Sequence, residues 1–174
     1  MDSLSKEQRS LLMGKIKSQD TTPELFIRSL LHRAGFRFRL HAKNLPGKPD
    51  IVLPKYKTII EIRGCFWHLH LNCSQARIPK TKSLWWKNKL ETNAKRDQLH
   101  CKILLSQGWR IVVVWGCIFK KIPSAFKPYF SRHLLGILDS AIKNQNAKFT
   151  EIDRDLLFHN PPLINGLISK GQTK

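Results

Sequence analysis

Long hydrophobic runs are missing from this 174-residue chain. The longest, near residues 111–115, falls far short of the roughly 18 apolar residues that a membrane span needs. Residues 1–6 hold no apolar stretch, so we expect no signal peptide and a cytoplasmic protein. With only four cysteines and no secretion signal, the chain is not expected to have a disulfide framework. Reduced thiols near histidines suggest a metal site instead.

Acidic residues are also scarce. Twelve Asp and Glu stand against 31 Lys and Arg, which gives a formal net charge of +19. Such an excess attracts polyanions, so nucleic acid is the leading partner and an anionic membrane surface the second. Five Trp and nine Phe argue against a disordered basic chain, because these rings must pack somewhere. The length suits one main domain.

The pattern of apolar residues predicts an α/β domain, a mixed sheet flanked by helices. Thr22 is the expected N-cap of the second helix, and Gly35 suits the position after its end. The apolar run over residues 109–115 has few polar breaks, which predicts a central buried strand. Beyond Asn144 the sequence shows no strong pattern. The expected helices are 5–17, 22–34, 83–107 and 134–142, and the expected strands are 36–40, 50–53, 58–62 and 109–115.

Two carboxylates are expected on neighbouring strands. Asp50 opens one strand, and Glu61, followed by Ile62 and Arg63, lies near the end of the next. Carboxylate oxygens can share a hard cation such as Mg²⁺, which can steady a phosphate or an attacking water. The arrangement resembles the PD-(D/E)xK nuclease pattern, with Arg63 in place of the usual Lys.

The irregular segment 63–82 carries cysteines and histidines at spacings suited to zinc, which takes four sulfur or nitrogen ligands in structural sites. The preferred set is Cys65, His70, Cys73 and Cys117. Two rival sets stay open, with His68 in place of His70 or Cys101 in place of Cys117. In the preferred set His68 remains free, and a neutral imidazole can deprotonate water near pH 7.

Aromatic residues stand among basic ones within this segment and just after it. Phe66-Trp67 and Trp85-Trp86 stand beside Arg63, Arg77, Lys80, Lys82, Lys87 and Lys89. Rings next to phosphate-binding cations are typical of nucleic-acid binding, although the same rings can form core.

Taken together, these residues resemble the very-short-patch-repair (Vsr) mismatch endonucleases, from about Ser5 to Ile118. The shared stretches are Arg9-Ser10 with Met13, residues 22–25 (TPEL), 45–52 (LPGKPDIV), 64–68 (GCFWH), Asn93 with Arg96-Asp97, and 108–117 from Gly108-Trp109-Arg110 to Cys117.

The resemblance implies a restriction-endonuclease-like fold and a Mg²⁺-dependent nick in one strand, 5′ to the thymine of a T·G mismatch formed by deamination of 5-methylcytosine. It implies Asp50 as metal ligand together with the backbone carbonyl of Ile62, with Glu61 either an extra ligand or a solvated neighbour. By position, the remaining catalytic residues would be Glu24, His68, Asp97 and Asn93, and the rings at the mismatch Phe66, Trp67 and Trp86, opposed by Met13.

On this basis we expect a basic DNA-contacting helix over residues 1–20, a nuclease domain with a zinc-stapled loop over 21–145, and a C-terminal tail of uncertain order over 146–174. The expected partner is double-stranded DNA with a T·G mismatch, with repair proteins as possible further partners. We expect the protein to act as a monomer and to have no membrane partner. Two alternatives remain: a nicking nuclease without mismatch preference, and a non-catalytic zinc-containing DNA-binding module.

Overall fold

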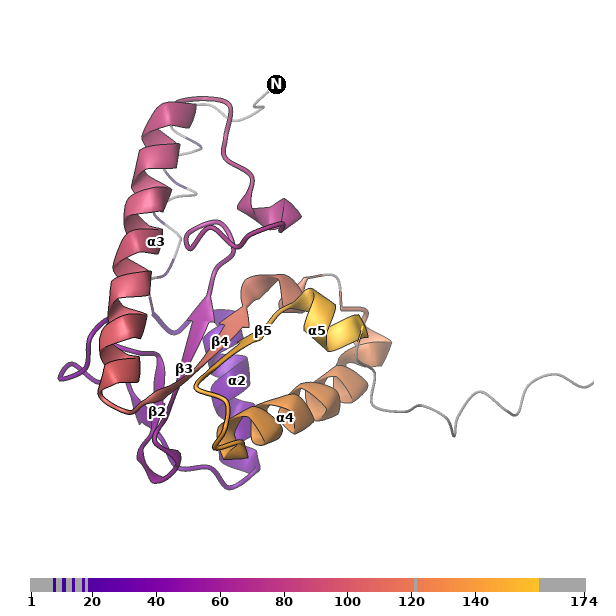
Figure 1. Ribbon diagram of the computed structural model, residues 1–174. Coiled ribbons are helices and arrows are strands. Elements are labelled where there is room, and N and C mark those ends of the chain that lie inside the picture. The colour runs from indigo at the N-terminus through magenta and orange to yellow at the C-terminus, as the bar shows by residue number, and fades with distance from the viewer. Residues whose placement is uncertain are drawn as a thin grey trace, which may run out of the picture. The chain divides into compact units, whose positions relative to one another are not determined.

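A computed structural model describes residues 19–120 and 122–159, together with Gln8, Leu11, Gly14 and Lys17 (Figure 1). The described residues fall into two compact units that divide between Arg37 and Phe38. The expected helix over residues 5–17, including Met13, lies almost wholly outside the described residues. The expected domain boundaries at residues 20 and 145 stay predictions.

A five-stranded mixed sheet forms the second unit, in the order β1-β2-β3-β4-β5. Its first three strands are antiparallel: β1 (Arg39–Leu40), β2 (Ile51–Leu53) and β3 (Thr58–Arg63). Next, β4 (Arg110–Trp115) pairs in parallel with β3, and β5 (Phe149–Ile152) pairs in parallel with β4. The predicted α/β class, hairpin and central strand are confirmed.

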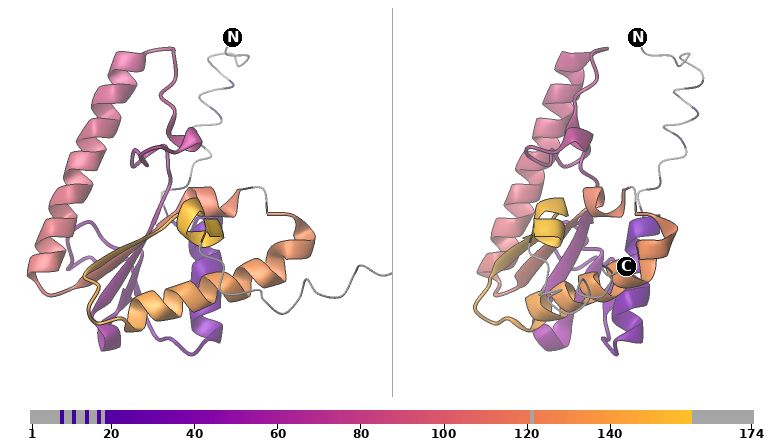
Figure 2. Two further views of the ribbon diagram at one scale, coloured as in Figure 1. Left: turned by 45° about the vertical axis from the view of Figure 1, so that its right-hand side comes forward. Right: turned by 90° about the vertical axis from the view of Figure 1, so that its right-hand side faces the viewer.

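Helices cover both faces of this sheet. Figures 1 and 2 show α3 (Ser83–Ser106) along one face and α4 (Lys127–Lys143) on the other. Strand β4 is buried along five consecutive residues, 111–115, as expected for a strand between two helical layers. Leu134, Leu138 and Ile142 of α4 are fully buried, so the closing helix predicted from them is confirmed.

The first unit contains α2 (Thr22–Arg33), the helix predicted over residues 22–34. Its N-cap is Thr21, one residue before the predicted Thr22, because the Thr21 hydroxyl oxygen accepts from the Glu24 N–H at 3.5 Å. Gly35 follows the helix end with φ of 85°, a left-handed conformation that a glycine adopts without strain.

The strand predicted over residues 36–40 was mostly wrong. Only Arg39 and Leu40 pair with β2, and Leu40 is 42% exposed. Phe36 does not enter the strand, because its N–H donates back to the Leu31 carbonyl at 3.0 Å and completes the end of α2. A helix-terminating contact therefore overrides the alternation of aromatic and basic residues.

The longest helix, α3, matches the predicted span closely. Leu90 and Leu104 are buried against the rest of the unit, whereas Leu99 is 56% exposed. The helix extends beyond the sheet, and the loop that precedes it runs beside its N-terminal half (Figure 1). Among the described residues, no helix is long and apolar enough to cross a membrane.

Beyond Asn144 the chain adds a strand and a helix that sequence patterns did not reveal. Strand β5 forms the sheet edge, and α5 (Arg154–His159) follows it. Only Ile152 of β5 is buried, so no alternation marks the strand. Its position comes from the parallel ladder to β4, a long-range pairing invisible to local periodicity.

Candidate active site and metal centre

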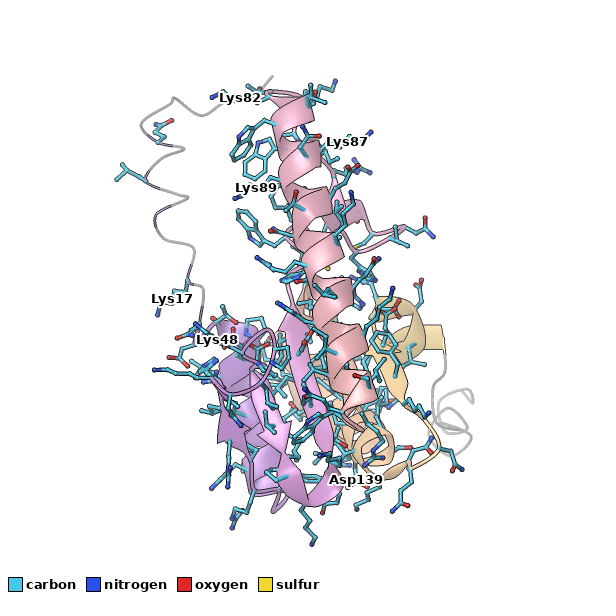
Figure 3. The ribbon with its side chains drawn as sticks, turned by 60° about the vertical axis from the view of Figure 1, so that its left-hand side comes forward. Lys17, Lys48, Lys82, Lys87, Lys89 and Asp139 are labelled. Atoms are coloured by element: carbon cyan, nitrogen blue, oxygen red, sulfur yellow. The ribbon has the colours of Figure 1, made fainter. Side chains whose placement is uncertain are left out.

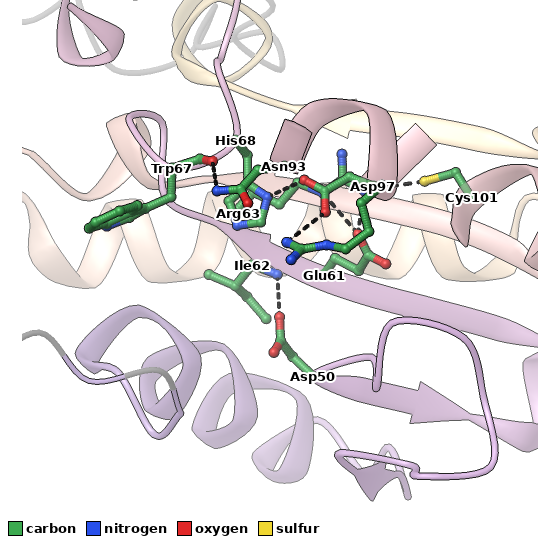
Figure 4. A network of polar contacts seen from close by, with 10 residues as sticks. Asp50, Glu61, Ile62, Arg63, Trp67, His68, Asn93, Asp97 and Cys101 are labelled. Carbon is green, nitrogen blue, oxygen red and sulfur yellow. Dashed lines mark hydrogen bonds and ion pairs between the residues drawn. The ribbon is translucent and has the colours of Figure 1, made fainter. Parts of the chain in front are cut away.

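The Asp50 carboxylate lies at the end of β3. Its Oδ2 accepts from the backbone N–H of Ile62 at 2.8 Å (Figure 4). Asp50 comes directly before β2, and the antiparallel hairpin brings the start of β2 beside the end of β3. The structure thus places Asp50 beside Ile62, the residue that the family resemblance implies as its neighbour at the metal.

Glu61 points away from solvent and is bound by Arg63. Both the Nε and an Nη of Arg63 donate to Glu61 Oε2, at 2.8 and 2.5 Å, and the two side chains are only 14% and 12% exposed. Arg63 also contacts Cys101 Sγ at 3.2 Å (Figure 4). Glu61 is therefore not the solvated neighbour that was one of its two predicted states.

A histidine–aspartate pair joins the loop after β3 to α3. His68 Nδ1 and Asp97 Oδ2 are 2.5 Å apart, and their side chains are 27% and 12% exposed. Burial opposes ionisation of Asp97, but the hydrogen bond with His68 and the nearby charges of His68, Arg63 and Arg96 lower the pKa of this carboxyl overall. With Nδ1 bound to Asp97, Nε2 is the imidazole nitrogen that can accept a proton from another group.

Asn93 lies one turn before Asp97 on α3 and anchors the same loop. Its Nδ2 donates to the Trp67 carbonyl at 3.3 Å, next to His68 in the chain (Figure 4). One helix face thus fixes both the backbone and the imidazole of the loop, because residues four apart lie on the same side of a helix.

Three half-buried rings, two from this loop and one from α3, pack edge to face. Ring centroids are 5.1 Å apart for Phe66–Trp67 and Phe66–Trp86, and 5.9 Å apart for Trp67–Trp86. Trp85, at 54% exposure, touches Trp86 and carries Lys89 Nζ 5.6 Å above its ring. Lys82, Lys87 and Lys89 surround this end of α3 (Figure 3). The arrangement forms an aromatic surface among cations.

The four preferred zinc ligands come together. One ligand atom each from Cys65, His70, Cys73 and Cys117 lies within 4.8 Å of every other. Tetrahedral zinc with bonds of about 2.0–2.3 Å holds ligand atoms about 3.3–3.8 Å apart, so small movements suffice. Neither rival ligand belongs to this group of four: His68 pairs with Asp97, and Cys101 contacts Arg63. The cluster is consistent with a zinc site.

Thiol electrostatics in the cluster favour a metal. A hydrogen bond from Cys65, opposed by burial and aided by the Arg154 backbone and His70, lowers the pKa of Cys117 to about 6. The same Cys117 contact and burial raise the pKa of Cys65. A lowered pKa favours the thiolate of Cys117, which is the form that binds a metal.

Two contacts to His70 were missed by sequence reasoning. The His70 ring stacks on Trp115 with centroids 4.0 Å apart, and its Nε2 lies 3.7 Å from Asp153 Oδ2. A carboxylate behind a ligating imidazole fixes the ring orientation. Asp153 follows β5, the strand that has no sequence signal, so its place near His70 could not be predicted. Trp115 ends the predicted buried strand just before Cys117, so its contact with a zinc ligand could have been predicted.

Glu24 is buried within the first unit and engaged at the start of α2. Its carboxylate oxygens accept from the Thr21 hydroxyl at 2.8 Å, the Asp20 N–H at 3.0 Å and the Arg28 guanidinium at 2.9 Å. The other predicted residue of the N-terminal region, Met13, lies outside the described residues.

A carboxylate at a strand end, a hydrogen-bonded His–Asp pair and an aromatic surface among cations, on an α/β fold with a Cys₃His cluster, are typical of an enzyme that acts on nucleic acid. Comparison with known proteins agrees. Residues 1–75 match the family described as DNA mismatch endonuclease Vsr.

Relatives match along most of their length. A type II nicking enzyme, V.XorIIP, of Xanthomonas oryzae is 47% identical over 116 residues, 67% of this chain and 85% of the relative. Another, V.NmeAIP of Neisseria meningitidis, is 42% identical over 119 residues, 68% and 84%. The DNA mismatch endonuclease Vsr of Escherichia coli is 37% identical over 115 residues, 66% and 73%. The chain therefore belongs to the Vsr family of DNA endonucleases, as its sequence motifs predicted.

Proposed function

We propose that this DNA endonuclease nicks one strand of duplex DNA 5′ to the thymine of a T·G mismatch, by Mg²⁺-dependent phosphodiester hydrolysis, in very short patch repair of deaminated 5-methylcytosine. The observation that carries the proposal is the 2.5 Å contact between His68 and Asp97. A DNA-binding module has no need for buried carboxylates beside a phosphate, since they would repel it.

The residues at the end of β3 fit a Mg²⁺ ion. Asp50 supplies carboxylate oxygens, and the Ile62 N–H points toward Asp50. In an extended strand the N–H and C=O of one residue point to the same side, so the Ile62 carbonyl also faces Asp50. Both are hard oxygen ligands. When bound, Mg²⁺ polarises the scissile phosphate and stabilises the leaving oxygen. The engagement of Glu61 by Arg63 supports its exclusion from this ligand set.

His68 acts as general base in this proposal. Asp97 holds Nδ1 and fixes the ring orientation, so Nε2 takes a proton from the attacking water. The lowered pKa of Asp97 keeps the carboxylate ionised, which stabilises the imidazolium that results. Asn93 positions the loop through Trp67, and Glu24 serves as the further active-site carboxylate that the family resemblance implies.

The aromatic surface recognises the mismatch. Phe66, Trp67 and Trp86 insert at the T·G pair, with Met13 opposing them, and the lysines of α3 bind flanking phosphates. Mutual edge contacts among the three rings support this role, because they let the rings act as one wedge. Since Phe66 and Trp67 precede His68 directly, insertion and chemistry are kept in register.

Zinc has a structural role in this proposal. Four protein ligands fill a tetrahedral site and leave no position for water. Cys117 follows β4, so the cluster staples the irregular loop after β3 to the sheet. The loop has little core of its own: apart from Cys65, residues 64–82 are half-buried or exposed.

The element order suits the restriction-endonuclease-like core that the resemblance implies. The β2–β3 hairpin is followed in the chain by α3 and then by β4, which pairs in parallel with β3. We propose this fold, a monomeric state and a cytoplasmic location as parts of the same account.

The test compares nicking of T·G-containing and matched duplexes of the same sequence, each with Mg²⁺ or with EDTA. The proposal requires nicking of the T·G duplex with Mg²⁺ alone. Equal nicking of both duplexes favours a relaxed nuclease, and binding without nicking under every condition favours the non-catalytic module. Nicking that persists in EDTA contradicts the metal requirement.

A further inference from the structure

A second basic feature lies far from the nicking site. A cavity of about 560 Å³ opens at the starts of β3 and β4, between Lys57 and Arg110. Its volume falls within the range of about 300–1,000 Å³ that small-molecule sites occupy. Asp50 and Ile62 lie at the other end of β3, about 17 Å along the strand.

Cations dominate this cavity. None of its lining residues in the described chain is acidic. Five of them are basic: Lys55, Lys57, Arg110, Lys143 and Lys148. Asp139 offsets one charge by pairing with Lys143 at 2.7 Å. The lining keeps a strong positive potential, which favours an anionic ligand.

Arg110 is held in place by neutral groups. Its guanidinium donates to the backbone carbonyls of Tyr56, Ile142 and Asn144, the second at 2.8 Å. Carbonyl partners fix the guanidinium without neutralising its charge. A preorganised cation loses little entropy when it meets an anion, which makes Arg110 the anchor of the cavity.

The cavity also offers apolar surface. Lys57 Nζ lies 4.4 Å above the Trp109 ring, Lys55 Nζ lies 5.6 Å from the Tyr56 ring, and Leu105 contributes an aliphatic side chain. Rings interleaved with cations suit a ligand that joins a planar base to a phosphate. A simple acidic peptide would use the cations but not the rings.

This cavity is separate from the aromatic surface. Leu105 lies 19 residues after Trp86 on α3, about 28 Å along the helix axis. In Figure 3, Lys82, Lys87 and Lys89 mark one end of α3, and Asp139, the partner of Lys143, lies near the other.

We propose that this cavity binds a phosphorylated nucleotide, with Arg110 and the surrounding lysines at the phosphate and the Trp109 and Tyr56 rings beside the base. The nucleotide comes either from the free pool or from a DNA strand away from the nick. Both sources present the same chemistry, and the experiment separates them.

The test follows the Trp109 indole N–H and the Lys57 amide in ¹H–¹⁵N spectra of the full chain, titrated with thymidine 5′-monophosphate, with a ten-residue oligothymidylate, and with a glutamate decapeptide. The variant Lys55→Glu/Lys148→Glu removes two pocket cations. Its matched control, Lys127→Glu/Arg132→Glu, makes the same charge change on exposed residues toward the other end of α4, where Lys127 lies about 24 Å from Lys143.

We expect both signals to move in a saturable way with a nucleotide probe, and the pocket variant to bind it at least about tenfold more weakly while the control binds within about twofold of wild type. Movement with the monophosphate assigns the free nucleotide, and movement with the oligonucleotide alone assigns a DNA strand. T·G nicking should persist in the pocket variant, so this result is independent of the proposed reaction. No movement up to about 10 mM probe, equal weakening in both variants, or tighter binding of the glutamate peptide would overturn the proposal.

Discussion

Two residues that are 29 positions apart in the sequence form the hydrogen-bonded pair of the candidate active site. His68 comes from an irregular loop and Asp97 from the middle of α3, yet their side chains meet at 2.5 Å. Asn93 fixes the loop backbone from the same helix. The imidazole is thus oriented before any substrate arrives, which is what a general base requires.

Replacing His68 by Ala should slow T·G nicking by about 10²- to 10⁴-fold, because one general base contributes that much. Zinc content should stay close to wild type, since His68 is not in the cysteine cluster. The measurement is a single-turnover nicking rate alongside zinc analysis of dialysed protein. The exposed His32 supplies the control, and His32→Ala should nick normally. Release of zinc by His68→Ala would show that His68, not His70, is the ligand.

Asp97→Asn should change how stability depends on pH. The folded-state pKa of Asp97 is lowered, so its ionised form stabilises the fold at pH values above the unfolded pKa of about 3.9. That contribution is lost as the pH falls through the folded pKa. We expect the difference in unfolding free energy between wild type and variant to be largest above about pH 5 and to shrink below about pH 4. Denaturant titrations across this range measure it, and a pH-independent difference would refute the pair as an electrostatic one.

At the scale of elements, one irregular loop carries both the catalytic histidine and two of the rings. It is held by the four-residue cluster on one side and by α3 on the other. Neither support is a regular ladder of backbone hydrogen bonds. The loop should therefore be the part of the described chain most dependent on metal.

Cys117→Ser should lose zinc and unfold the loop, since metal binding supplies folding free energy where a segment has little core. Cys101→Ser is the matched control. Cys101 contacts Arg63 instead of the cluster, so this variant should keep one zinc per chain. Zinc analysis after dialysis, with limited proteolysis of the loop, makes the comparison. Equal zinc content in the two variants would refute the ligand assignment.

Trp67→Ala separates a wedge from a core residue. As a wedge, the variant should fold normally, keep its zinc and bind matched DNA almost unchanged, while its preference for T·G duplexes falls by about 1–3 kcal/mol. Binding titrations with both duplexes and a thermal melt give the answer. A lower melting temperature with an unchanged mismatch-to-match ratio would assign the ring to the core.

At the scale of the whole molecule, sequence patterns anticipated much of the architecture. Residues with strong local signals were placed well: the buried run of β4, the β2–β3 hairpin and the long α3. The zinc ligands and the Asp50–Ile62 neighbourhood followed from residue chemistry and family resemblance. The spacing of cysteines and histidines in the chain was not enough to choose the zinc ligands, because it also allowed His68 and Cys101.

What sequence could not provide depends on long-range contacts. Strand β5 has one buried residue and owes its place to pairing with β4. Asp153, behind His70, comes with that strand. The ion pair of Glu61 with Arg63, which takes the Glu61 carboxylate out of solvent, could not be read from alternation along one strand. Phe36 shows the reverse case, in which a helix-ending hydrogen bond defeated a clear local pattern.

We propose that Asp50 serves the cleavage reaction and is not needed to bind DNA. The most direct measurement is T·G nicking and T·G duplex binding on one preparation of Asp50→Ala. Removing a carboxylate near a phosphate reduces repulsion, so we expect binding as tight as wild type or tighter, with nicking abolished. Nicking by the purified variant above about a few per cent of the wild-type rate would contradict the account, since loss of a required metal ligand should cost far more.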